Sequence, residues 1–474
     1  MADRDIALMA HLMRRAGFGA TRDELEAYVA KGYEATVEEL LYPERQPAFE
    51  EDLYLRAYPD FQDRPALESN HTLWAYRMIN TRRPLEEKMA LFWHGILCSG
   101  YAKVDNGREM SLQIDMFRRY GLGSFRNLLI QLSRNPAMVQ FLDNVDNHKG
   151  NINENYGREL LELFSLGVGM DGKYNYTEDD VKACSRAFTG WNLAPTLPVF
   201  PYGRSEWQFL YDPADHDTSE KTFLGETGRW NGEDIVDIIV RQPGAARFIA
   251  RHLYNFFVAD EPQVPAWKDT PPRDMEAIRA LEEAFVESKY DMRSVLRVLF
   301  NSDFFKSEDV WYAKIKSPTD VVIETMRLVG DFKHPKPGLF PIAMEIRYMG
   351  QDLMNPPTVE GWHTGREWID SGTLVERINF VADQVGNINL PGVRAIIDRL
   401  MARSDTTAPA GFVDGCLDLM GPLTVTDKTH NSLIAHVRQG GPLRRNTEAE
   451  RSNFASRVGQ MLQMIAASAE YQYA

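Results

Sequence analysis

Apolar side chains recur every three or four positions along most of this chain, which is the spacing of one face of an α-helix. The pattern is clearest in residues 151–191. Counted from Tyr156 at 100° per residue, Leu160, Leu163 and Phe164 fall on one face. The segment therefore predicts an amphipathic helix that packs this face against a core.

A second helix is predicted to begin after Thr177. Thr177 and Asp180 have the spacing of a capping box, with Asp in place of the usual Glu, and Thr21 and Glu24 repeat this signal near the start of the chain. The acidic, proline-containing segment 43–65 is predicted to be irregular. Further helical patterns cover residues 84–97, 109–120, 125–133, 234–241, 245–258, 273–288, 292–300 and 448–470.

Residues 192–230 break the helical pattern. Prolines, aromatic residues and short alternating runs predict one or two β-hairpins there, and an insert of this length is expected to be ordered and functional. The segment 348–369, rich in Gly, Pro and Trp, is predicted to be a loop. The fold class is therefore mainly α: one large domain over residues 1–474, with an orthogonal or bundle-like body of many helices, the hairpin insert and a candidate N-terminal subdomain at 1–60.

The composition narrows the class of protein. With 44% hydrophobic and 26% charged residues, the chain is typical of a globular protein. A net charge of −15 argues against a general nucleic-acid-binding surface, and the lack of 18 consecutive apolar residues argues against a membrane span. Three cysteines without disulfide or zinc spacing, and no signal peptide, predict a cytoplasmic protein, with export expected only if a leader has been removed.

Two ionisable residues fall on apolar helix faces. Glu159 lies beside Leu163 at the edge of the apolar stripe, where loss of water raises the pKa of a carboxyl group. A structural ion pair is the alternative interpretation. His94 lies in a helix that is apolar nearly all round, so it fits both a functional histidine and a hydrogen-bonded core group.

The predicted insert carries a dense group of titratable side chains, Asp215, His216 and Asp217. The flanking carboxylates would favour the charged imidazolium and raise the pKa of His216. A surface turn is the alternative interpretation, and the sequence does not decide between the two.

Several motifs occur together over nearly the whole chain. They are H-L-M-R-R-A-G-F-G-A-T (11–21), P-L-E-E-K-M-A-L-F-W-H (84–94), N-P-A-M (135–138), N-E-N-Y-G-R-E-L-L-E-L-F-S-L-G (153–167), A-F-T-G-W (187–191) and P-P-T-V-E-G-W (356–362). In this order they resemble the bacterial proteins grouped as domain of unknown function 1800. Relatives usually continue F-W-H with Asn-His-Phe, whereas this chain has Gly95, Ile96 and Leu97, which weakens a His-x-His metal pair. Many relatives are exported, and many are encoded beside a sulfatase-like protein, so the resemblance implies such a partner.

The first functional hypothesis is an enzyme that acts on a polar small molecule, such as a carbohydrate. Glu159 would be the acid/base, His94 and His216 would carry protons, and Asp217 would orient His216. Alternatively, Glu159, His94 and His216 would together bind a divalent metal ion as the cofactor.

Four further residues are expected to bind the substrate of this enzyme. Arg158 and Arg186 would hold an anionic or hydroxyl-rich substrate, and Trp191 and Trp362 would enclose it. The second hypothesis is a non-catalytic assembly or maturation partner of the sulfatase-like protein. It predicts an exposed apolar patch around Trp362 and Trp368.

Overall fold

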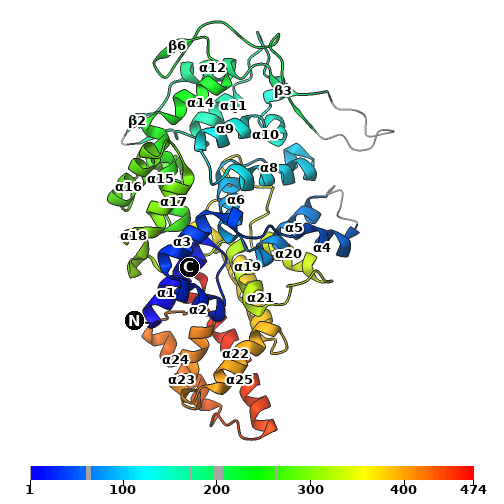
Figure 1. Ribbon diagram of the computed structural model, residues 1–474, viewed down its shortest axis with the longest axis vertical. Coiled ribbons are helices and arrows are strands. Elements are labelled where there is room, and N and C mark those ends of the chain that lie inside the picture. Colours follow the sequence, from blue (N-terminus) through cyan, green and yellow to red (C-terminus); the bar gives the residue numbers. More distant parts are fainter. Residues whose placement is uncertain (1, 60–65, 171, 196–206, 263) are drawn as a thin grey trace.

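The computed structural model describes residues 2–59, 66–170, 172–195, 207–262 and 264–474. The chain is mainly helical, as the sequence predicts, and the strands of the described residues form two-stranded antiparallel pairs. Figure 1 shows an elongated arrangement with α11 (Asn155–Glu162) and the hairpins at one end and the last helices at the other. Helix α1 (Ala2–Ala16) and the C-terminus both lie near the middle.

The first half of the chain builds the central and upper parts of the view in Figure 1. Its further helices are α2 (Arg22–Lys31), α3 (Tyr33–Leu41), α4 (Glu51–Ala57), α5 (Leu67–Asn80), α6 (Pro84–Ile96), α7 (Tyr101–Val104), α8 (Gly107–Tyr120), α9 (Phe125–Ser133), α10 (Pro136–Phe141) and α12 (Glu178–Ala187). The predicted bounds of α9 agree with the structure at both ends. The prediction of an irregular segment at 43–65 is wrong where α4 forms, because burial of Tyr54 stabilises this short helix.

The second half returns through the centre, forms the lower part of Figure 1 and ends near the middle. Its helices are α14 (Gly232–Val240), α15 (Pro243–Phe257), α16 (Met275–Glu287), α17 (Met292–Asn301), α18 (Asp303–Lys306), α19 (Pro318–Val329), α20 (Leu339–Tyr348), α21 (Ser371–Gly386), α22 (Pro391–Ala402), α23 (Pro409–Leu419), α24 (Asp427–Gln439) and α25 (Glu448–Ala466). Between α20 and α21 the chain is largely loop, as predicted.

Local sequence signals explain several helix starts. The capping boxes predicted at Thr21 and Thr177 are both formed, with reciprocal bonds to Glu24 and Asp180. Ser317 and Asp320 also form a capping box at the start of α19. The following residue, Pro318, favours the extended backbone that Ser317 has as the N-cap.

The predicted hairpin insert is present. Strand β3 (Trp191–Leu193) pairs with β4 (Phe209–Tyr211), and β5 (Lys221–Phe223) pairs with β6 (Glu226–Gly228). A third small pair, β1 (Gly169–Met170) with β2 (Lys173–Tyr174), lies just before the insert. Residues 196–206 of the insert, including the predicted extended run V-F-P-Y, lie outside the described residues.

The buried apolar side chains form one continuous cluster that extends from Ile6 to Tyr471. Residues of the candidate subdomain 1–60, such as Met13 and Tyr54, belong to this same cluster rather than to a core of their own. A second, small cluster contains Ile315, Trp362 and Trp368. None of the described helices is both long and apolar enough to cross a bilayer.

Candidate functional site

A cavity of about 100 Å³ lies at the centre of the molecule, where segments far apart in the sequence meet. Its walls come from the end of α1, from α6 and α15, from residues 314–320 and from the loop segment 360–368. We call it the central cavity. It is large enough to hold several water molecules or a small anion.

Three buried lysines surround the central cavity or support its wall, and each has a carboxylate partner. Lys88 forms an ion pair with Asp320, Lys314 with Asp260 at 3.3 Å, and Lys316 with Glu324 at 2.9 Å. The ammonium groups are thereby neutralised, as buried charges usually are. These lysines account for much of the basic character of the wall but leave little net charge.

Three buried arginines in the same region have backbone carbonyl partners instead. Arg14 donates to the Gly421 carbonyl at 2.9 Å, Arg15 to Val310 at 2.9 Å, and Arg377 to Lys316 at 2.8 Å. Within the part of the chain that the structure describes, none of the three forms an ion pair, and further N–H groups of each lack a hydrogen-bond partner. Arg14 and Arg15 line the central cavity, which therefore presents unpaired positive charge.

Burial of these guanidinium groups is energetically unfavourable. Desolvation, followed by the charge of Arg14, lowers the pKa of Arg15 to about 9, and desolvation lowers that of Arg377 to about 10. Only 2% of the surface of Arg15 is exposed to solvent. Burying a charged group away from water costs several kcal/mol, roughly, and the charges of Asp260 and Asp320 offset only part of this cost for Arg15.

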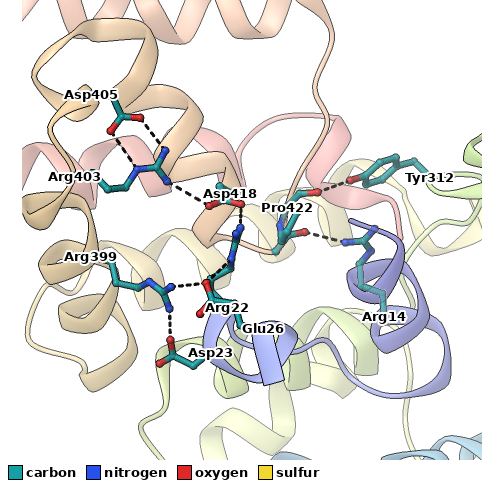
Figure 2. Close-up of polar contacts among 11 residues, drawn as sticks. Arg14, Arg22, Asp23, Glu26, Tyr312, Arg399, Arg403, Asp405, Asp418 and Pro422 are labelled. Carbon is teal, nitrogen blue, oxygen red and sulfur yellow. Dashed lines mark hydrogen bonds and ion pairs between the residues drawn. The ribbon is translucent and has the colours of Figure 1, made fainter. Parts of the chain in front are cut away.

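Figure 2 shows that the neighbouring arginines Arg22 and Arg399, unlike Arg14, have carboxylate partners. Arg22 pairs with Asp418 and Glu26, and Arg399 pairs with Glu26 at 2.6 Å and with Asp23. Arg14, from the adjacent helix, instead reaches the carbonyl of the loop before Pro422. These pairs fix α1 and α2 against α22 and α23, and they hold Arg14 in place without neutralising it.

Part of the lining of the central cavity is aromatic. Phe92 from α6, Phe256 from α15, and Trp362 and Trp368 from the loop all line it. Trp362 and Trp368 are buried, so the predicted exposed patch around them is wrong: both pack inward with Ile315. Trp362, which was expected to enclose a substrate, is one of the residues that line this cavity.

His94 helps to hold this loop in place. Its Nε2 accepts a hydrogen bond from the Met354 N–H at 2.8 Å, and its ring packs edge-on against Trp362, with 5.2 Å between centroids. Burial, and then the charge of His71, lowers the pKa of His94 to about 3. Cys98 donates to the Val359 carbonyl at 3.2 Å and adds a second attachment. His94 is therefore a neutral positioning residue and does not line the cavity.

Glu159 is not among the residues that line the central cavity, but it lies four residues before Leu163, which does. Leu163, whose N–H donates to the Glu159 carbonyl at 2.9 Å, lines the cavity, as does Glu360. Burial, followed by the charges of Glu162 and Glu360, raises the pKa of Glu159 to about 7, against the opposing effect of Arg158. The expected rise in the pKa of this carboxyl group is confirmed.

His216, Asp217 and Arg186 lie in a different place, under the hairpins. His216 is hydrogen-bonded through Nδ1 to the Thr189 carbonyl at 2.9 Å. Asp217 accepts from Arg186 Nε at 2.8 Å, and with Ser219 this arginine holds the pKa of Asp217 well below its usual range against the effect of burial. The prediction that Asp217 orients His216 is wrong, because the carboxylate is bound to Arg186 instead.

Arg158 and Trp191 are also absent from the central cavity. Arg158 forms a bidentate pair with Glu178, with both distances 2.8 Å, and is partly exposed, as its helical phase indicates. Trp191 donates to Asn231 at 2.8 Å and packs between Phe188 and Phe209. The prediction that Arg158 and Arg186 share a substrate pocket with Glu159 is therefore wrong, since both are neutralised elsewhere.

The proposed metal ligands Glu159, His94 and His216 do not form a group. Over the described ranges, no three His, Cys, Asp or Glu side chains lie close enough together to hold a metal ion. His94 uses its Nε2 for Met354, and His216 belongs to the cluster under the hairpins. The prediction of a metal site built from these three residues is wrong.

Arg14 and Arg15 were missed as site residues, although they lie within the motif H-L-M-R-R-A-G-F-G. The amphipathic pattern of α1 places them away from Met9 and Met13, which normally predicts solvent-exposed charges. The structure buries them because the α18 region and the loop at Gly421 cover this face of α1. The sequence signal that could have indicated this site is the pair of adjacent arginines directly before Ala16 and Gly17.

Comparison with known proteins places the chain in a family. Neither the curated proteins nor the solved structures give a match. The model of the family described as protein of unknown function (DUF1800) matches residues 11–473, which include both arginines, Glu159 and the loop with Trp362. The chain belongs to this family, and the resemblance inferred from its motifs is correct.

Proposed function

We propose that the protein binds a small anionic ligand in the central cavity. The observation that carries this proposal is the unpaired positive charge of Arg14 and Arg15 on the cavity wall. The overall net charge is −15, so a buried basic site is not a by-product of a basic protein. An anion would supply the missing counter-charge and hydrogen-bond acceptors.

The chemistry of the arginines indicates the kind of anion. A guanidinium group offers a planar fork of donors that matches the oxygen pairs of phosphate, sulfate and carboxylate groups. Arg15 has Nε and Nη1 without a partner, so both nitrogens keep N–H donors for the oxygens of an anion. The aromatic part of the lining would accept an apolar or ring-shaped remainder of the ligand, and a carbohydrate ring fits this description.

Calorimetric titration with inorganic phosphate and sulfate tests the proposal. Arg15→Met should weaken phosphate binding by at least about tenfold, equivalent to about 1.4 kcal/mol. Arg403→Met is the matched control, because Arg403 is paired with Asp405 at 3.0 Å and does not line the cavity. Equal loss in both variants, or no binding of either anion by the wild type, would contradict the proposal.

The raised pKa of Glu159 favours a catalytic role in addition to binding. A carboxyl group with a pKa of about 7, which is influenced by the cavity residue Glu360, is suited to general acid/base catalysis at neutral pH. We expect Glu159→Gln to lose at least about 100-fold in turnover of any phosphate or sulfate ester that the wild type converts. Phosphate affinity should be retained in this variant. Unchanged turnover in Glu159→Gln would exclude this role.

The alternative function, assembly or maturation of a sulfatase-like protein, stays a prediction from the family resemblance. It required an apolar patch around Trp362 and Trp368, and both side chains are buried. Co-purification of the chain with a sulfatase-like protein would revive it.

A further inference from the structure

One face of α6 lines the central cavity along most of the length of the helix. The lining residues on this face are spaced three or four positions apart: Lys88, Leu91, Phe92, Gly95 and Ile96. At a rise of 1.5 Å per residue, Lys88 and Gly95 are separated by roughly 10 Å along the helix axis. The cavity therefore extends along α6 from a charged residue to a glycine.

The two ends of this face contact different parts of the chain. Nζ of Lys88 lies 4.6 Å from the centre of the Phe18 ring, and Phe18 follows Arg15 by three residues. At the other end, a Cβ atom added to Gly361 would lie 2.2 Å from the Gly95 carbonyl oxygen, so the loop backbone passes directly against α6. The segment that carries the arginine pair therefore packs near the start of α6, whereas Gly95 lies at the end that the loop covers.

Gly95 leaves room on the cavity wall. Apart from its sequence neighbours and the adjoining helix backbone, no atom of the described residues lies within 4 Å of a Cβ added there. At the helical residues Gly157 and Gly232, by contrast, an added Cβ would lie 2.2 Å and 2.5 Å from a side chain of another segment. The backbone of Gly95 is helical, without a positive φ. Neither packing nor conformation therefore requires glycine at position 95, where alanine would favour the helix more.

Aromatic rings lie close to this open position. Phe92, one turn before Gly95, packs against Phe256 with 5.2 Å between the ring centroids. Trp362 packs against His94, the residue directly before Gly95, again with 5.2 Å between centroids. Phe92, Phe256 and Trp362 all line the central cavity. The surroundings of Gly95 therefore favour an apolar group.

The charged residues that the loop adds to the lining are exposed to solvent. The side chains of His363 and Glu360 are 48% and 40% exposed, and their nearest charged atoms are 3.7 Å apart. Water screens both groups, whereas Phe92 and Trp362 are only 1% and 7% exposed. The buried lining at this end of α6 is therefore apolar.

From this juxtaposition we infer that the ligand is an oxyanion with a compact apolar group, and that Gly95 determines how large this group can be. Arg14 and Arg15 hold the oxyanion, and the apolar group lies beside Gly95 against the aromatic lining. The class comprises short alkyl esters of phosphate and sulfate and the corresponding phosphonates and sulfonates. The inference rests on the proposed anion site, because it assigns the other end of the same ligand.

A series of anions that differ only in the alkyl group tests this inference. Inorganic phosphate, methyl phosphate and n-butyl phosphate are titrated calorimetrically into the full chain. We expect n-butyl phosphate to bind at least about tenfold more tightly than methyl phosphate, because three further methylene groups are buried. Gly95→Leu fills the open space, so it should abolish most of this preference and keep the affinity for inorganic phosphate.

Two further variants keep the test decisive. Ala435→Leu adds an apolar side chain at an exposed position of α24, which does not line the cavity, and should keep the preference. If Gly95→Leu does not fold, Gly95→Ala decides: its methyl group should weaken n-butyl phosphate binding at least about threefold and leave inorganic phosphate binding unchanged. Unchanged n-butyl phosphate affinity in Gly95→Ala would then overturn the inference.

The inference and the anion site fail in different ways. Equal affinity of the wild type for methyl and n-butyl phosphate would overturn the inference and leave the anion site intact. A preference for n-butyl phosphate that survives in folded Gly95→Leu would also overturn it. If none of the three anions binds, the anion site itself is wrong.

Discussion

The central cavity and the cluster under the hairpins both bury many polar groups, yet they differ in one respect. Under the hairpins the polar groups satisfy each other: Asn147 donates to Asn144 at 3.1 Å and to the Ser185 carbonyl at 2.8 Å, and accepts from the Asn153 N–H at 3.1 Å. In the central cavity Nε and Nη1 of Arg15 are left without acceptors. Burial of polar residues therefore does not by itself identify a ligand site, whereas incomplete hydrogen bonding does.

The largest expected effect is a loss of stability when the hydrogen-bonded cluster under the hairpins is disrupted. Asn147→Ala removes the hydrogen bonds that this side chain donates to Asn144 and the Ser185 carbonyl and accepts from Asn153, which should lower the free energy of unfolding by about 3 kcal/mol. Chemical denaturation measures this change. Phosphate binding by the folded variant should equal that of the wild type. Asn389→Ala, at an exposed asparagine, is the control and should change stability by less than about 0.5 kcal/mol.

The next largest effect is the stabilisation expected when phosphate binds in the central cavity. Phosphate at 100 times its dissociation constant should stabilise the wild type by about 2.7 kcal/mol, measured against chloride at the same ionic strength. Arg15→Met should lose this stabilisation, yet without phosphate it should be at least as stable as the wild type, because a buried unpaired charge has been removed. If Arg15→Met and Asn147→Ala destabilise the phosphate-free protein equally, the distinction between the two regions fails.

A smaller effect is expected for the pH dependence at Glu159. Its pKa is raised from 4.5 to about 7 in the folded protein, so the folded state binds the extra proton and the wild type loses stability as the pH rises through this window. Glu159→Gln should match the wild type near pH 5 and exceed it at pH 8. The gain should stay below about 2 kcal/mol, because the carboxyl group is partly screened by water. Parallel pH profiles of melting temperature would contradict this assignment.

The smallest effect is expected at Arg158, which the sequence placed among the substrate-binding residues. Its pairs with Glu178 and Glu154 are partly exposed, and Arg158→Ala should reduce stability by less than about 1 kcal/mol. Titration with phosphate should give an unchanged dissociation constant. A tenfold loss of phosphate affinity in Arg158→Ala would show that Arg158 does contribute to the ligand site.

Local patterns predicted much of the fold and one part of the site. The capping boxes at Thr21 and Thr177 depend on residues within one helical turn, which a sequence displays directly. The apolar stripe beside Glu159 likewise indicated the burial that is the largest cause of its raised pKa. Arg15 acquires its environment from Val310, 295 residues away, and no local period encodes that contact. The same limit explains why His216 and Asp217 were assigned to each other rather than to Thr189 and Arg186.

The long separation between Arg15 and Val310 also has a consequence for how the protein is made. At about 5–20 residues per second, the ribosome needs roughly 15–60 s to deliver the second residue after the first. During that interval the face of α1 that carries Arg14 and Arg15 lacks the segments at Val310 and Gly421 to which these side chains donate in the folded protein. A newly made chain should therefore complete this wall of the central cavity only late in its synthesis.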